Sequence, residues 1–75
     1  MIRCRLGDIM KERGLTNKEV VTLTGVSRNT ITSLSANATK RIDYDTFNGI
    51  CKGLNVSPAE LFEYIPDNNE EDRQE

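Results

Sequence analysis

The sequence predicts a single all-α domain built from five short helices. Two observations carry this prediction: apolar residues recur three and four positions apart in several segments, and helix start and stop residues bracket those segments. The chain has 75 residues, of which 36% are hydrophobic and 29% are charged, which is typical of a globular domain. A chain of this length buries only about 60% of its unfolded surface. It therefore has room for one small core but not for a deep enzyme cleft.

The first helix is predicted over residues 5–13. Its apolar residues fall on one helical face: Leu6, Ile9 and Met10. Gly14 ends this helix, because glycine adopts the left-handed conformation at low cost. Residues 1–4 alternate apolar and polar side chains, which is compatible with a short strand that pairs near Tyr64–Ile65.

The second helix opens with a capping box. Thr16 is the expected N-cap, and Glu19 stands three residues later, so each side chain can accept a hydrogen bond from the other's backbone amide. A short apolar face follows, made of Val20, Val21 and Leu23. Gly25 then ends the helix where the chain needs a left-handed residue.

The third helix follows after a tight turn. Val26 fills the turn, Ser27 caps the helix, and the inward residues are Ile31 and Leu34. The side chains left facing away from the core are all polar: Arg28, Asn29, Thr32 and Ser33. An exposed helix face of this composition suits insertion into the major groove of DNA.

Two further helices are predicted, over residues 43–54 and 57–64. Asp43 caps the first, Asn55 ends it, and its core stripe is Phe47, Ile50, Cys51 and Leu54. Ser57, Pro58 and Glu60 form the start signal of the second. Gly49 and Gly53 share one helix face, and two interpretations stay open: they permit close approach of another helix, or they occupy solvent positions that tolerate glycine.

Residues 5–65 resemble the Cro/repressor-type helix-turn-helix family, the lambda-repressor-like domain of small prokaryotic and phage regulators. The resemblance rests on Asn17 at the start of the first motif helix, Gly25 at the turn, and the order of the five helices; branched apolar residues also match late in the second motif helix, at Ile31 and Leu34. Val21 departs from the family pattern, which usually has alanine there. The resemblance implies a helix-turn-helix at the second and third helices, a DNA-binding domain over residues 1–65, and double-stranded DNA as the partner. One such module buries only about 600–1,000 Å² on DNA, so a homodimer on paired half-sites is expected.

The start of the third helix is predicted to read bases. Arginine pairs with guanine and asparagine with adenine, so Arg28 and Asn29 are expected at base edges, with Thr32 and Ser33 one turn later. The resemblance places phosphate contacts on both sides, which are expected at Thr16, Asn17 and Lys18 for one strand and at Ser35, Asn37, Thr39, Lys40 and Arg41 for the other. For each of these residues the competing interpretation is an ordinary solvent-exposed position.

The charge is distributed unevenly along the chain. Residues 1–65 hold nine Lys and Arg against seven Asp and Glu, whereas residues 66–75 hold one Arg and five acids. The net charge of −2 therefore combines a weakly basic body with an acidic segment that is predicted to be disordered. A basic body is compatible with DNA binding. The acidic tail raises a second hypothesis, an antitoxin-like or anti-regulator module that binds a protein partner, although such a tail can also serve solubility alone.

Other functions have little support in the sequence. The chain has no histidine, and its two cysteines lack CxxC spacing, so we expect no metal site, no cofactor and no catalysis. It has no apolar run of about 20 residues and no signal-peptide pattern, which argues for a cytoplasmic protein without membrane contact. Surfaces of the fourth and fifth helices are candidate dimer elements, namely Gly49, Gly53, Tyr64 and Ile65.

Overall fold

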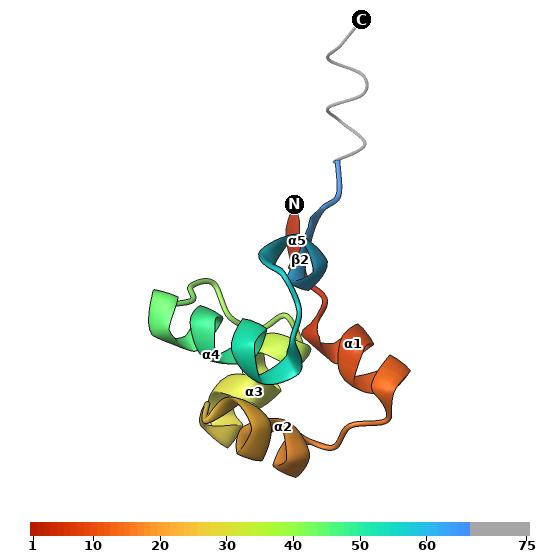
Figure 1. The fold of residues 1–75 in the computed structure, drawn as a ribbon. Helices are drawn as coiled ribbons and strands as arrows, with labels where there is room; N and C mark the ends of the chain where they lie inside the picture. The colour runs from red at the N-terminus through yellow and green to blue at the C-terminus, as the bar shows by residue number, and fades with distance from the viewer. Residues whose placement is uncertain (67–75) are drawn as a thin grey trace, which may run out of the picture.

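A computed structural model describes residues 1–66 of the chain and shows five helices and a two-stranded sheet (Figure 1). The elements, in order, are β1 (Ile2–Cys4), α1 (Leu6–Arg13), α2 (Asn17–Thr24), α3 (Arg28–Ser35), α4 (Tyr44–Leu54), α5 (Pro58–Leu61) and β2 (Phe62–Tyr64). The predicted five-helix order and the helix-turn-helix at α2 and α3 are confirmed. The predicted disorder of residues 67–75 lies outside the described residues.

Apart from the end of α5, the helix ends form at the residues that the sequence indicated. Thr16 and Glu19 make the full capping box, with hydrogen bonds of 3.2 Å and 2.8 Å between side chains and backbone amides. Asp43 accepts from the backbone amide of Thr46 at 3.1 Å. The turn of the helix-turn-helix depends on Gly25, whose φ of 73° is left-handed and is easily adopted only by glycine.

The core lies between the five helices, each of which contributes at least one buried residue. Its fully buried members include Leu6, Ile31, Ile50 and Leu61, most of them predicted from helical periodicity. One part of the prediction is wrong: Leu23 was expected on the apolar face of α2 but is 50% exposed. Val20, on the same helix, is fully buried.

The two glycines of α4 lie directly against α2. A Cβ atom at Gly53 would be 2.8 Å from the Cα of Thr24, and one at Gly49 would be 3.0 Å from the Thr24 carbonyl oxygen. The close-approach interpretation is therefore correct and the solvent interpretation is wrong. Because α2 of the same chain covers both glycines, the expectation that they contribute to a dimer surface is also wrong.

The fifth helix is shorter than predicted. It ends at Leu61, and Phe62–Tyr64 pair antiparallel with β1 in the register Ile2 to Tyr64, Arg3 to Glu63 and Cys4 to Phe62. Opposite charges face each other across this sheet, with Arg3 Nη1 2.8 Å from Glu63 Oε1. Phe62 also packs edge-on against Phe47, with ring centroids 5.2 Å apart. Pairing and packing together favour a strand over a further helical turn.

The sheet holds both ends of the described chain together beside α5 and above α1–α4 in the view of Figure 1. Within residues 1–66, none of the helices combines the length and apolar content needed to cross a membrane.

Candidate nucleic-acid interface

Helix α3 presents a polar face to the outside of the molecule. Arg28, Asn29 and Thr32 are exposed and Ser33 is half-buried, while Ile31 on the opposite side is fully buried. Within residues 1–66, the side chains of Arg28 and Asn29 form no hydrogen bond or ion pair. Their donors and acceptors are therefore open to an external ligand.

The start of α3 is fixed by its own cap. Ser27 Oγ accepts a 3.3 Å hydrogen bond from the backbone amide of Thr30. The Ser27 hydroxyl also pairs with Thr30 Oγ1 at 2.9 Å. Thr30 therefore takes part in capping the N-terminus of α3. The cap fixes the backbone of the first turn, from which Arg28 and Asn29 point outward.

The N-terminus of α2 lies beside this face. Asn17 Nδ2 donates a 3.3 Å hydrogen bond to Thr32 Oγ1, so the side chain joins the two helices of the motif. The capping box occupies the amides of Thr16 and Glu19, which leaves those of Asn17 and Lys18 without helical partners. Unpaired amides at a helix N-terminus carry a partial positive charge that favours an anion.

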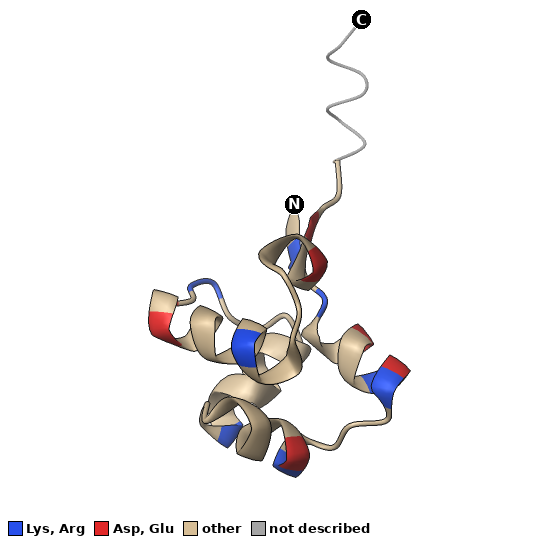
Figure 2. Ribbon diagram, in the orientation of Figure 1, with Lys and Arg blue, Asp and Glu red and all other residues tan. Residues whose placement is uncertain are grey.

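The loop after α3 borders the other side of the same face. A hollow lies between them, lined by Asn29 and Ser33 from α3 and by Thr39 and Arg41 from the loop. The structure therefore brings four of the residues predicted for DNA contact to one depression. Lys40 is exposed in the same loop, and Figure 2 shows positive charge in blue along the loop before α4.

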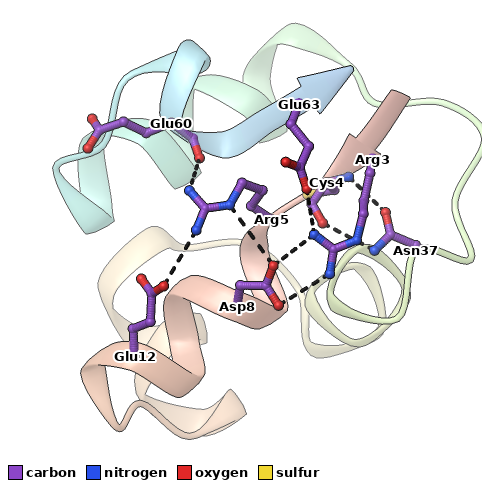
Figure 3. Close-up of polar contacts among 8 residues, drawn as sticks. All are labelled: Arg3, Cys4, Arg5, Asp8, Glu12, Asn37, Glu60 and Glu63. Atoms are coloured by element: carbon purple, nitrogen blue, oxygen red, sulfur yellow. Dashed lines mark hydrogen bonds and ion pairs between the residues drawn. The ribbon is translucent and has the colours of Figure 1, made fainter. Parts of the chain in front are cut away.

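Asn37 has a structural role that sequence reasoning missed. Its φ is 58°, and its side-chain amide both accepts from the Cys4 amide at 2.7 Å and donates to the Cys4 carbonyl at 3.1 Å (Figure 3). Both ends of the Asn37 side-chain amide therefore bind β1 in the free protein. The predicted phosphate contact at Asn37 would require these hydrogen bonds to break. Asparagine tolerates the left-handed conformation better than most residues, so its presence in this loop could have indicated a structural turn position.

Ser35 is also engaged by the fold. Its hydroxyl donates to the Thr32 carbonyl at 3.0 Å. Its own carbonyl oxygen lies 2.7 Å from the position of a Cβ atom at Gly7, so α1 and α3 pack with no room for a side chain there. This close packing fixes the end of α3 that leads into the loop.

Most acids of the described chain are bound elsewhere. Arg3 pairs with Asp8 at 2.7 Å and Arg5 with Glu12 at 3.5 Å, in a cluster around β1, β2 and α1 (Figure 3). Hydrogen bonds from the Arg3 guanidinium hold the pKa of Asp8 below its usual range. Helix α3 itself carries no acid.

The cations next to the polar face of α3 remain unpaired. Within residues 1–66, no carboxylate forms an ion pair with Lys18, Arg28, Lys40 or Arg41. Four of the described cations without an ion pair therefore lie around α3, although the whole chain is acidic. Such a local excess of cations can attract a polyanion.

Comparison with known families identifies the domain type. The model of the Cro/C1-type HTH DNA-binding domain matches residues 4–67, which include all five helices. No curated protein matches the chain.

Proposed function

The chain belongs to the Cro/C1-type helix-turn-helix DNA-binding domain family, and from this premise we propose that it is a sequence-specific transcriptional regulator. The observation that carries the proposal is the polar face of α3, whose Arg28 and Asn29 are exposed and unpaired within residues 1–66. A helix of this kind docks in the major groove with its first residues at base edges. The proposal includes no catalytic step and no cofactor.

We assign base contacts to α3 and phosphate contacts to its two flanks. Arg28 suits guanine and Asn29 suits adenine, while Thr32 and Ser33 offer hydroxyls one turn later. The proposed phosphate contacts are Thr16, Asn17 and Lys18 on one flank and Ser35, Thr39, Lys40 and Arg41 on the other. Asn37 is left out of this set because its amide binds Cys4.

We also propose that the regulator acts as a homodimer in the cytoplasm of a prokaryotic cell. One module of this kind buries only about 600–1,000 Å² on DNA, which is little for tight discrimination. Two copies would contact half-sites about 34 Å apart, or a multiple of that distance. Tyr64 and Ile65 are exposed on and next to β2 and stay candidates for the contact between copies.

Selection of bound sequences from a random DNA library tests the proposal. We expect one enriched motif with two related halves, and binding of that motif should weaken steeply as salt rises. Recovery of no motif, with weak binding to every sequence, would contradict a sequence-specific regulator. Such a result together with a co-purifying protein would favour the antitoxin-like or anti-regulator hypothesis instead.

A further inference from the structure

A groove separates the two-stranded sheet from the loop that follows α3. Ile2 and Phe62 line it from the sheet, and Leu34 and Ile42 line it from the other side. Lys40 and Arg41 also line this groove, and both are exposed. An apolar groove with two cations suits a peptide segment that carries several carboxylates.

Neither cation has a carboxylate partner within residues 1–66. The next acid along the chain is Asp43, and its carboxylate is held by Thr46, through hydrogen bonds of 3.1 Å to the amide and 2.7 Å to the hydroxyl. The charge of Lys40 and Arg41 is therefore not balanced by an ion pair inside the described domain.

The chain carries a segment of the opposite charge shortly after β2, which ends at Tyr64. Residues 67–75 hold five acids and one arginine, a net charge of −4. Strand β2 ends beside the groove, because Tyr64 at its end is paired with Ile2, which lines the groove. A chain of nine residues can span up to about 30 Å.

We propose that the acidic segment 67–75 docks in this groove and competes with DNA phosphates for Lys40 and Arg41. The inference rests on the proposed DNA-binding function. Exposed ion pairs are individually weak, but a short tether raises the local concentration of the carboxylates to the millimolar range. The segment would thus lower the affinity for every DNA sequence, because phosphate contacts carry no sequence information.

Docking can be tested without DNA. The full chain is compared by NMR with the variant Glu70→Gln, Glu71→Gln and Asp72→Asn, which keeps the length and shape of the segment. We expect the amide signals of residues 39–42 and Phe62 to differ between the two proteins at every protein concentration, and the difference to vanish in about 1 M salt, where screening is nearly complete. Unchanged signals at these residues would overturn the proposal. A difference that appears only at high protein concentration would assign the groove to a second copy and would also overturn it.

Competition is then measured by DNA binding at low salt. We expect the triple variant, whose segment 67–75 keeps a net charge of −1, to bind any DNA sequence about three- to tenfold more tightly than the original chain. The gain should disappear when Lys40→Ala and Arg41→Ala are also present. It should persist with Lys11→Ala and Lys52→Ala, a matched pair of exposed cations that do not line the groove.

The gain in DNA affinity could have the same size in the original chain, in the Lys40 and Arg41 variant and in the Lys11 and Lys52 variant. That result would mean general repulsion between the segment and DNA, and would overturn the groove assignment. Failure of every variant to bind DNA would contradict the proposed function, while the NMR comparison would still decide whether the segment docks.

Discussion

At the scale of single residues, the proposed interface depends on which hydrogen-bonding groups the fold already uses. Thr32 accepts a hydrogen bond from Asn17, and Asn37 is bound to β1 through both ends of its amide. Arg28 and Asn29 form no such contact within residues 1–66. Groups that stay unpaired in the free protein can form hydrogen bonds to bases without first breaking an internal one.

This difference predicts the effect of truncating the two unpaired side chains. Arg28→Ala and Asn29→Ala should each weaken binding to the selected site by about 1–3 kcal/mol and relax the preference at one base pair. Thermal unfolding should hardly change, because both side chains are exposed. Fluorescence anisotropy at fixed salt, on the selected site and on random DNA, measures both effects.

Lys11→Ala is the matched control for the lost charge of Arg28, because Lys11 is exposed on α1 and away from the polar face of α3. It should leave base preference unchanged. If Arg28→Ala weakened binding to random DNA as much as to the selected site, Arg28 would contact phosphate rather than a base.

At the scale of helices and strands, the features that depend on neighbouring residues could be predicted from the sequence. The caps at Thr16, Ser27 and Asp43 involve partners three residues away, and short-range patterns of this kind are visible in the chain. The polar face of α3 could be predicted in the same way, because the helical spacing of Ile31 and Leu34 places these two residues on the buried side and the polar residues on the other. The predicted face and the structure agree for these reasons.

Features that depend on distant partners could not be predicted in the same way. Phe62–Tyr64 form a strand only because β1 pairs with them, and the sequence after α5 alone continues a helical pattern. Periodicity placed Gly49 and Gly53 on one face but did not indicate which element covers it. Asn37 was likewise placed near phosphate by resemblance, whereas its partner, Cys4, is far away in the chain.

The contact between α2 and α4 predicts that Gly53→Ala destabilises the fold. Alanine favours an isolated helix over glycine by about 1 kcal/mol, but the added Cβ would lie 2.8 Å from both Leu23 C and Thr24 Cα. Backbone atoms cannot rotate away, so we expect a net loss of about 1–3 kcal/mol in urea unfolding. Asn48→Ala, at an exposed position of the same helix, should be neutral or slightly stabilising. A Gly53→Ala variant as stable as the original chain would show that the two helices are not closely packed.

At the scale of the whole molecule, the arrangement of charge reconciles an acidic chain with a nucleic-acid interface. The acids of α1 and β2 are paired with Arg3 and Arg5, while other acids occupy helix caps. The cations next to α3 remain free within residues 1–66. Net charge alone would therefore mislead, because binding to DNA depends on the cations that meet phosphates locally.

The same paired acids make stability depend on pH. Hydrogen bonds from Arg3 lower the pKa of Asp8, those from the Thr46 hydroxyl and amide lower that of Asp43, and the Ser57 amide lowers that of Glu60. A carboxyl whose pKa is lower in the folded state stabilises the fold above its ordinary pKa, and this contribution is lost as pH falls through the folded value. We therefore expect the melting temperature to be steady near neutral pH and to fall below about pH 4.

Two variants separate the sources of this acid sensitivity. Asp43→Asn should keep its neutral-pH melting temperature, because asparagine caps helices about as well as aspartate, but it should lose less stability in acid since the titrating group is gone. Asp8→Asn should be less stable at neutral pH, where the pair with Arg3 is lost, and should also show a shallower acid decline. Melting curves between about pH 2 and pH 7 test both expectations. Variants whose curves fall as steeply as that of the unmodified chain would show that neither carboxylate couples folding to protonation, and the source would then lie at Glu60 or elsewhere in the chain.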